Sequence, residues 1–219
     1  MILLESKAVL LDKVKVNSRP IYHAVKRGFD FIAATCGLIL LSPVMLWIAF
    51  LIKREDHGPV FYKQTRVGKN GKIFEMYKFR SMFVNADQML DKLKDQNDVE
   101  GPMFKMKKDP RITKVGHFIR EHSLDELPQF INVIKGDMSL VGPRPPLPSE
   151  VAEYSEYDKQ RLYVIPGCTG LWQATERNEV GFNEMVQLDI EYIKKASFSF
   201  DLWILWKTIE IVIKPNSSY

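Results

Sequence analysis

The stretch FIAATCGLILLSPVMLWIAFLI, from Phe31 to Ile52, contains no charged residue in a chain of 219 residues. Elsewhere charges are frequent, so the overall figures of 46% hydrophobic and 26% charged residues average two different kinds of sequence. As one straight helix the run would be about 33 Å long, enough to cross a bilayer core. It is too long, and too far from the N-terminus, for a cleaved signal peptide. Its length therefore predicts a segment that meets a membrane.

Ser42 and Pro43 lie in the middle of this run. Because proline lacks a backbone N–H and disfavours helix in the residue before it, the run divides into two arms of about 15 Å, half the hydrocarbon thickness. Basic pairs flank both ends, Lys26-Arg27 and Lys53-Arg54, so the positive-inside tendency gives a span no preferred orientation. We predict a re-entrant helix-break-helix hairpin whose basic flanks lie beside anionic headgroups; a Pro-kinked spanning helix and a buried core helix remain alternatives.

The rest of the chain predicts an α+β, helix-rich protein. We expect a leader or linker at 1–22, the membrane hairpin at 23–56 and a small cytosolic catalytic domain at 57–219. Gly68-Lys69-Asn70-Gly71 between two β-rich runs predicts a β-hairpin over 58–82. Trp203 and Trp206 in the tail indicate either a core helix or a helix in the membrane interface. Further helices are predicted at 84–97, 113–121, 125–135, near 150–163 and at 182–195.

Composition excludes several classes of function. A formal net charge of +4 is modest, and no nucleic-acid recognition motif, P-loop or GxGxxG is present, so we expect no nucleic-acid partner. The two cysteines, Cys36 and Cys168, cannot form a disulfide framework and indicate a reducing compartment. The four histidines are scattered, which argues against a zinc site.

The sequence Ser123-Leu124-Asp125-Glu126-Leu127-Pro128 is the most suggestive for chemistry. It could be an ordinary capping box with Ser123 as N-cap and Glu126 three residues later. Pro128 is more comfortable in a helix that starts later, with Asp125 as N-cap. Asp125 and Glu126 would then lie at the positive end of a helix dipole.

Cations lie in or beside the predicted turns and element ends. Arginine donates paired hydrogen bonds to phosphate oxygens, and Mg²⁺ binds through one or two carboxylates together with substrate phosphates. A basic cluster facing two carboxylates therefore suits a divalent cation, with Asp125 as its protein ligand, and a diphosphate. The candidate phosphate-binding residues are Lys78, Arg80, Arg111, Arg120 and Arg144.

From Lys26 to Lys214 the chain resembles the monotopic polyprenyl-phosphate phosphoglycosyl transferases, bacterial enzymes that start glycan assembly on a lipid carrier. Longer members carry a transmembrane bundle before this unit, so the chain resembles their catalytic unit alone. The shared landmarks, besides Ser42-Pro43, are KRGFDF at 26–31, YKFRSM at 77–82, DPRITKVGHFIR at 109–120, SLDELPQ at 123–129, GDMSLVGPRP at 136–145 and PGCTGLWQ at 166–173.

The resemblance implies transfer of a sugar-1-phosphate from a UDP-sugar to undecaprenyl phosphate, with release of UMP. It implies that Asp125 forms a covalent aspartyl-phosphosugar intermediate, that Glu126 assists, and that Mg²⁺ neutralises the diphosphate. Lys78, Arg120 and Arg144 match phosphate-binding or active-site positions, and Ser42-Pro43 matches the break of a re-entrant helix. The expected place is the cytoplasmic face of the bacterial inner membrane, in contact with one leaflet, at the first membrane step of capsule, exopolysaccharide, O-antigen or glycoprotein assembly.

Other expectations stay open. Arg177, Asp189 and Tyr192 are candidates for the nucleotide or sugar end, with surface or packing roles as alternatives. Glu176 stands where many members of the family have glycine. Whether the turn after PGCTGLWQ has the shape usual in the family is therefore open. The tail could supply a homodimer face as readily as a membrane contact. Two other functions remain: a non-catalytic membrane scaffold for glycan assembly, and a metal-dependent nucleotide-sugar hydrolase.

Overall fold

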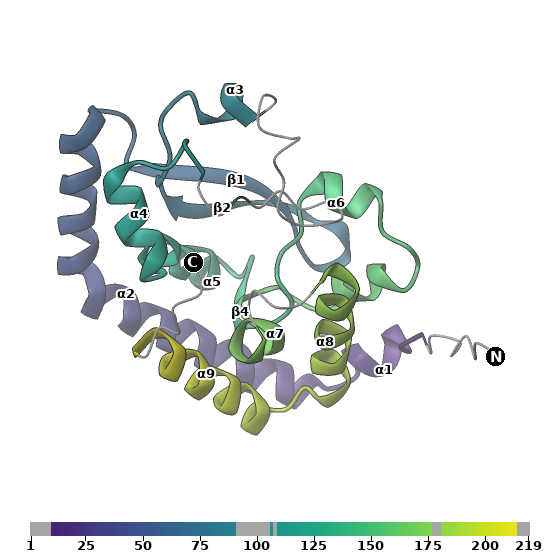
Figure 1. The fold of residues 1–219 in the computed structure, drawn as a ribbon. Coiled ribbons are helices and arrows are strands. Elements are labelled where there is room, and N and C mark those ends of the chain that lie inside the picture. Colours follow the sequence, from purple (N-terminus) through teal and green to yellow (C-terminus); the bar gives the residue numbers. More distant parts are fainter. Residues whose placement is uncertain (1–9, 91–105, 107–108, 177–180, 214–219) are drawn as a thin grey trace.

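The computed structural model describes residues 10–90, 106, 109–176 and 181–213. Figure 1 shows a long helix, α2, running along the lower and left edges of the molecule, with α9 beside its lower part and the β1–β2 hairpin on the far side. The helices are α1 (Lys13–Asn17), α2 (Pro20–Asp56), α3 (Ala86–Leu90), α4 (Lys114–Glu121), α5 (Gln129–Lys135), α6 (Pro148–Ala152), α7 (Leu171–Thr175), α8 (Phe182–Lys195) and α9 (Phe198–Ile213). The strands are β1 (Phe61–Val67), β2 (Ile73–Phe79), β3 (Ser139–Val141) and β4 (Gly167–Thr169), and short 3₁₀ turns are η1 (Lys69–Gly71), η3 (Leu124–Glu126) and η4 (Asp158–Tyr163).

Helix α2 contains Pro43 and is bent. The helical conformation continues through the proline, so the two predicted arms form one helix that changes direction between its lower and its left part (Figure 1). The Ser42 hydroxyl donates to the carbonyl of Ile39 at 2.7 Å. Since Ile39 is four residues before Pro43, this is the carbonyl that proline leaves without its usual donor. The helix begins at Pro20, slightly before the predicted boundary of the leader.

Helix α2 exposes most of its apolar side chains. Among the described residues, it alone is long and apolar enough to cross a membrane, and only 11% of its most apolar window, of mean hydropathy 2.3, is buried. Ile39, Leu40, Leu46 and Trp47 are 69%, 78%, 72% and 62% exposed. A core helix of a water-soluble protein would bury such side chains, so this surface fits the membrane alternatives better than the buried one.

The N-terminal basic flank is engaged within the protein. Arg27 donates to the last carbonyls of α5, at 2.5 Å to Val133 and 2.8 Å to Ile134. Lys26 forms an ion pair with Asp201 at 3.1 Å. Both cations therefore hold α2 against other helices, and the placement of this basic flank beside headgroups stays a prediction.

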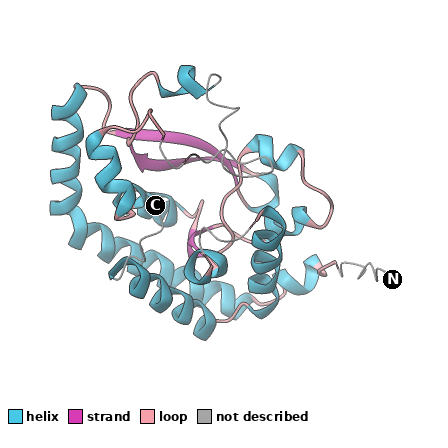
Figure 2. Cartoon of the chain, viewed as in Figure 1, coloured by secondary structure: helices cyan, strands magenta, loops and turns pink. Residues whose placement is uncertain are grey.

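The β1–β2 hairpin confirms the prediction from Gly68-Lys69-Asn70-Gly71. The strands are antiparallel, with Phe61 opposite Phe79 and Val67 opposite Ile73. Asn70 and Gly71 have φ values of 57° and 80°, which asparagine and glycine tolerate in tight turns. Figure 2 shows these two long strands on the side of the molecule away from α9.

A second, parallel strand pair was not predicted. β3 and β4 pair Ser139 with Gly167 and Val141 with Thr169. The pair depends on close backbone approach, because a Cβ at Gly167 would lie 2.1 Å from the backbone nitrogen of Gly142. Strands of three residues are too short to show alternation in the sequence.

The helices around Asp125 begin differently from the prediction. α4 matches 113–121 closely, but Asp125 does not cap a helix: Leu124–Glu126 form the 3₁₀ turn η3, and α5 begins at Gln129 after Pro128. Ser123 makes no capping bond and adopts a left-handed conformation with φ 55°. The predicted helix near 150–163 is divided into α6 and η4, and that at 84–97 is described only as α3. α8 matches 182–195.

Helix α9 has one buried and one exposed apolar face. Ile204 is fully buried in the main core, while Trp203 and Trp206 are 42% and 62% exposed. The core interpretation of the tail is therefore confirmed for one face of this helix, and the membrane-interface interpretation of its exposed face stays a prediction. The main core gathers side chains from α2, β2, α5, β3, α7, α8 and α9: Ala34, Phe74, Met76, Val133, Met138, Leu140, Val141, Leu171, Ala174, Tyr192, Ile193 and Ile204.

Asp201 at the start of α9 joins three helices. Its carboxylate accepts from the hydroxyls of Tyr22 at 2.9 Å and Tyr192 at 2.7 Å, besides the ion pair with Lys26. The side chain of Asp201 is 3% exposed. Buried charges of this kind are stable only while all their partners are present.

We predict that Asp201→Ala lowers the free energy of unfolding by about 3–5 kcal/mol, because it leaves the Lys26 ammonium buried without its counter-ion. Chemical unfolding in detergent measures the effect. Glu191→Ala, which breaks the exposed Glu191–Lys195 pair on α8, is the control and should cost less than about 1 kcal/mol. An equally small loss of unfolding free energy in both variants would show that Asp201 does not hold the three helices together.

Candidate active site

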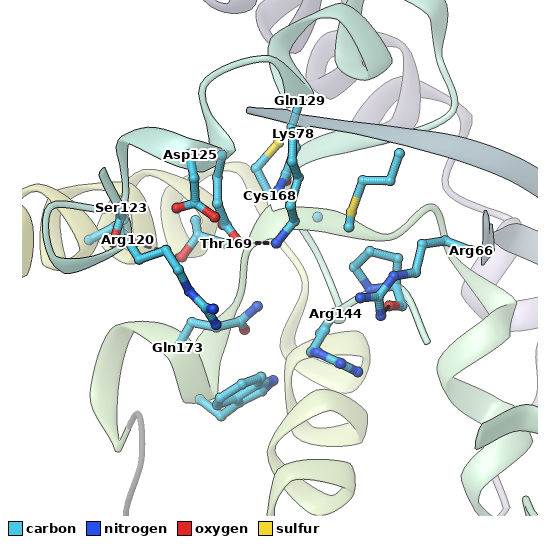
Figure 3. A pocket seen from close by; sticks show the side chains of 16 residues that line it. Arg66, Lys78, Arg120, Ser123, Asp125, Gln129, Arg144, Cys168, Thr169 and Gln173 are labelled. Atoms are coloured by element: carbon cyan, nitrogen blue, oxygen red, sulfur yellow. Dashed lines mark hydrogen bonds and ion pairs between the residues drawn. The ribbon is translucent and has the colours of Figure 1, made fainter. Parts of the chain in front are cut away.

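A pocket of about 330 Å³ lies where η3 faces β2, β4 and α7. Figure 3 shows it from close by, with Asp125 and Arg120 on one side and Arg144 and Arg66 on the other. The pocket collects residues from both strand pairs and from α9, so it exists only in the folded chain. It is lined by Arg66, Met76, Lys78, Arg120, Ser123, Asp125, Glu126, Gln129, Arg144, Pro145, Gly167, Cys168, Thr169, Trp172, Gln173 and Thr208.

Asp125 and Glu126 both line the pocket from η3. Lys78, near the end of β2, donates to the Glu126 Oε1 at 2.6 Å, an ion pair that Figure 3 shows as a dashed line. The Glu126 side chain keeps 42% of its surface exposed and that of Lys78 keeps 22%. The carboxylate of Asp125 makes no such ion pair with Lys78. It lies beside the Lys78–Glu126 pair and is available to a ligand.

The two adjacent carboxylates have pKa values shifted in opposite directions. Burial raises the pKa of Asp125 to about 6, and the charge of Glu126 adds to this rise, while Lys78 and Arg120 oppose it. Burial also acts to raise the pKa of Glu126, but the charge and hydrogen bond of Lys78 outweigh it and hold that pKa below its usual value. Two neighbouring carboxyl groups whose pKa values differ in this way are typical of sites where each acid has a different role.

Three of the predicted cations, Lys78, Arg120 and Arg144, come together at the pocket. Arg144 pairs with Glu150 at 3.0 Å, and the Glu150 side chain is only 1% exposed. The Arg120 Nη1 is buried and has no hydrogen-bond partner in the part of the chain that the structure describes. A buried guanidinium nitrogen without a partner is costly, and a bound anion would satisfy it.

Arg66, a fourth cation at the pocket, was not predicted. It lies near the end of β1, is 6% exposed, and donates to the carbonyl of Pro145 at 2.8 Å and to Gln64 at 2.6 Å. Burial lowers its pKa to about 10, and the neighbouring charge of Arg144 adds to the shift. Two arginines of like charge in one pocket wall indicate a place for a polyanion. The sequence gives no sign of this, because Arg66 belongs to no motif of charged residues.

Arg80 and Arg111 do not reach the pocket. Arg80 pairs with Asp56 at the end of α2, tying the hairpin to that helix, and its hydrogen bonds lower the pKa of Asp56 to about 2. Arg111 pairs with Asp109 at 2.6 Å, two residues away. Each of these arginines has a carboxylate of its own, and neither points into the site predicted for it.

The candidates for the nucleotide or sugar end also lie elsewhere or outside the description. Asp189 is fully buried and accepts from Arg161 at 2.8 Å. Tyr192 donates to Asp201 within the core. Both positions match the packing alternative rather than ligand contact. Arg177 lies outside the described residues, which resume at 181.

The residues of β4 and α7 supply a further wall of the pocket. The sequence marks this stretch as a landmark of the family it resembles, but none of its residues was predicted as a site residue. Cys168, Thr169, Trp172 and Gln173 all belong to the PGCTGLWQ stretch and all line the pocket. Burial raises the pKa of the Cys168 thiol, so this cysteine stays protonated. Thr169 bonds Thr208 of α9 at 2.8 Å, which fixes the floor of the pocket to that helix.

The two carboxylates would suit a magnesium ion whose other ligands are phosphate oxygens and water. Among the described residues no group of three or more histidine, cysteine, aspartate or glutamate side chains could hold a metal. Mg²⁺ needs only one or two carboxylates when phosphate oxygens and water complete its octahedron. The carboxylate of Asp125 is not paired with Lys78, so its oxygens can bind a metal ion. Lys78 bonds only one oxygen of Glu126, so the other oxygen can bind the ion as well.

A family model described as bacterial sugar transferase matches residues 21–215. The chain belongs to this family. The exopolysaccharide production protein ExoY of Rhizobium meliloti is 42% identical over 205 residues, which cover 92% of this chain and 91% of the relative. The galactosyl transferase CpsE of Streptococcus agalactiae is 48% identical over 189 residues, 86% of this chain.

Some relatives are much longer than the chain. The undecaprenyl-phosphate galactose phosphotransferase of Salmonella typhimurium is 43% identical over 199 residues, which are 89% of this chain and 42% of the relative. CpsE is likewise matched over 42% of its length. The part matched by the family model, 21–215, contains the pocket and all of α2 except Pro20.

We predict that the Asp125 carboxyl titrates near pH 6 in the metal-free protein, and that Lys78→Met raises the midpoint, because it removes a cation that stabilises the charged form. Carbon-13 NMR of labelled aspartate measures both. Lys207→Met, which removes an exposed lysine of α9, should leave the midpoint unchanged. A midpoint near 4 in the parent protein would contradict this account of the pocket.

Proposed function

We propose that the chain transfers a sugar-1-phosphate from a UDP-sugar to undecaprenyl phosphate, releasing UMP and forming an undecaprenyl-diphosphate sugar. The observation that carries the proposal is the pair Asp125 and Glu126, with separated pKa values, in a pocket lined by Arg66, Lys78, Arg120 and Arg144. The names of relatives support the choice of substrates, since one is an undecaprenyl-phosphate galactose phosphotransferase.

In the first step an oxygen of the Asp125 carboxylate attacks the phosphorus bonded to the sugar. A bond between Asp125 and phosphorus forms, the bridging P–O bond breaks, and its electrons leave with UMP. In the second step an oxygen of undecaprenyl phosphate attacks the same phosphorus, and the Asp125 carboxylate is released. The intermediate is an aspartyl-phosphosugar, a form of covalent catalysis that divides one displacement into two.

The surrounding side chains have distinct tasks in this scheme. At neutral pH a pKa of about 6 leaves Asp125 mostly ionised, as a nucleophile requires. Lys78 holds Glu126 charged and fixes its position, so that Glu126 can orient the incoming lipid phosphate. Arg120 and Arg144 donate to phosphate oxygens as charge shifts during transfer. Mg²⁺, when bound through Asp125 and Glu126, supplies further neutralisation of the diphosphate.

We predict that Asp125→Asn abolishes sugar-phosphate transfer, lowering the rate by about 10³-fold or more, and removes the phosphosugar adduct from the protein. Mass spectrometry of the protein mixed with UDP-sugar, and UMP release on adding undecaprenyl phosphate, measure the two effects. Asp158→Asn, at an exposed turn beside Ser155, is the matched control and should keep full activity. An unchanged rate in Asp125→Asn would refute its role as nucleophile.

The same assay separates the two other functions that the sequence left open. UMP released only when undecaprenyl phosphate is present supports transfer. Release that is independent of lipid would identify a nucleotide-sugar hydrolase. Absence of release with every UDP-sugar would favour a scaffold, in which the pair Asp125 and Glu126 has no catalytic task.

We also propose that α2 is a re-entrant anchor that enters and leaves the membrane on the cytoplasmic side of the inner membrane. Its bend, the bond from Ser42 to Ile39 and its exposed apolar surface support this topology. An anchor of this kind leaves the pocket on the side where nucleotide sugars are found. The exposed Trp203 and Trp206 of α9 suit the headgroup layer, where the acceptor phosphate lies.

We predict that Ala24→Cys and Lys63→Cys, before and after the apolar run, react with a membrane-impermeant thiol reagent only from the cytoplasmic side. The background Cys36→Ser, Cys168→Ala removes the native thiols. Intact spheroplasts and inverted vesicles give the comparison, since both positions are exposed in the structure. Labelling of the two positions from opposite sides would establish a spanning helix instead.

A further inference from the structure

Two side chains of α7 bring buried, unpartnered polar atoms to the pocket. The Trp172 Nε1 and the Gln173 Oε1 have less than 1 Å² of exposed surface each and no hydrogen-bond partner among the described residues. Both residues line the pocket that holds Asp125. Native proteins leave few such atoms unpaired, so atoms of this kind at a pocket wall indicate hydrogen bonds that a ligand completes.

The backbone makes room for the Gln173 amide. A Cβ at Gly170 would lie 2.6 Å from the Gln173 Oε1 and 2.5 Å from the carbonyl oxygen of Gly142. Gly170 precedes the first turn of α7, so the absence of a side chain there lets the amide fold back over the strand-to-helix junction. The Gln173 amide oxygen thus lies against this junction, although it accepts no hydrogen bond from the residues that the structure describes.

The chemistry of this wall differs from that of the rest of the pocket. Arg66, Lys78, Arg120 and Arg144 carry the positive charge that phosphates require, whereas Trp172 and Gln173 are neutral. A neutral donor and a neutral acceptor match hydroxyl or amide groups, which the proposed donor carries on its sugar and on its uracil. The position of the wall relative to Asp125 decides between these two parts.

Displacement at phosphorus places the attacking and leaving oxygens on opposite sides. With Asp125 as the attacking group, the leaving nucleotide points away from it, and Figure 3 shows Arg144 and Arg66 across the pocket from Asp125. The sugar is bonded to the phosphorus that Asp125 attacks and therefore stays close to Asp125. Gln173 lies on the Asp125 and Arg120 side in the same view, which favours the sugar over the uracil.

We propose that Trp172 and Gln173 form a sugar-recognition wall. The Trp172 N–H donates to, and the Gln173 amide oxygen accepts from, hydroxyl groups of the sugar that travels with the phosphate. The proposal rests on the function proposed above and assigns part of its donor specificity to α7. A site built to bond a hydroxyl discriminates strongly against a substrate that lacks it, because its own polar atoms then stay unpaired.

The test compares the UDP-sugar that the parent protein uses fastest with analogues of it that each lack one sugar hydroxyl. In the parent protein we expect one analogue or more to lose about 10–100-fold in kcat/KM. Gln173→Leu keeps the size of the side chain and removes the amide. We expect it to lower kcat/KM for the full donor by a similar factor. In this variant, kcat/KM for the same analogue should then be less than about threefold below that for the full donor. The KM for undecaprenyl phosphate and the Kd for UMP stay within about twofold.

Two further variants make the result specific. Trp172→Phe keeps an aromatic ring and removes the N–H together with part of the indole, and it carries the same test should Gln173→Leu fail to fold. Thr175→Val on α7 is the control: Thr175 bonds the carbonyl of Leu171, does not line the pocket, and should leave all ratios unchanged.

The proposal is overturned if the variants lower kcat/KM equally for the full donor and every analogue. A fall in UMP affinity that matches the fall in kcat/KM would overturn it too and would place the uracil at this wall. A parent protein that releases no UMP with any donor would instead refute the proposed function itself, before any variant is compared.

Discussion

The apolar surface of α2 is the constraint on which the rest of the structure depends. A helix of this length with only 11% of its most apolar window buried suits an apolar solvent on its outer side. On its inner side it must hold the remaining chain in place. Lys26 and Arg27 do this through Asp201 of α9 and the end of α5, and Asp56 does it through Arg80 at the end of β2. The pocket is thereby attached to α2 from both ends of the helix.

Within this frame one ion pair organises the chemistry. Lys78 reaches Glu126 because the register of the hairpin places it near the end of β2, opposite Tyr62. The pair holds the pKa of Glu126 below its usual value, while burial raises the pKa of the neighbouring Asp125 to about 6. Ser123 has a left-handed conformation, and the 3₁₀ turn that follows it carries both carboxylates, which line the same pocket.

The elements that local chemistry determines were predictable from the sequence. Asn70-Gly71 predicted the turn of the hairpin, and the helical spacing of 182–195 gave α8. Ser42-Pro43 predicted the disturbance in α2, and the Ser42 hydroxyl bonds the carbonyl that Pro43 leaves unpaired. Lys78, Arg120 and Arg144, which the sequence grouped with Asp125 and Glu126, line one pocket with them. The features that the sequence did not predict depend on partners distant in sequence or are very short elements, such as β3 and β4.

The cations show this limit most clearly. Arg80 and Arg111 look like Lys78 and Arg120 in the sequence, but each finds a carboxylate elsewhere, at Asp56 and Asp109. Arg66 looks like an exposed strand residue and is buried at the pocket wall. Whether a polar group already has a partner is a property of the folded chain, so the unpaired atoms of Trp172 and Gln173 could be recognised only in the structure.

The depth of the pocket in the bilayer shows whether α2 holds the Asp125 pocket at the membrane surface. A nitroxide at His122, an exposed position next to Ser123, can be compared with nitroxides at Leu40 and Lys63 by oxygen and nickel accessibility in lipid nanodiscs. We predict His122 in the interfacial layer, about 5–8 Å thick, with Leu40 in the hydrocarbon and Lys63 in water. A nitroxide at His122 that is as accessible to nickel as one at Lys63 would contradict it.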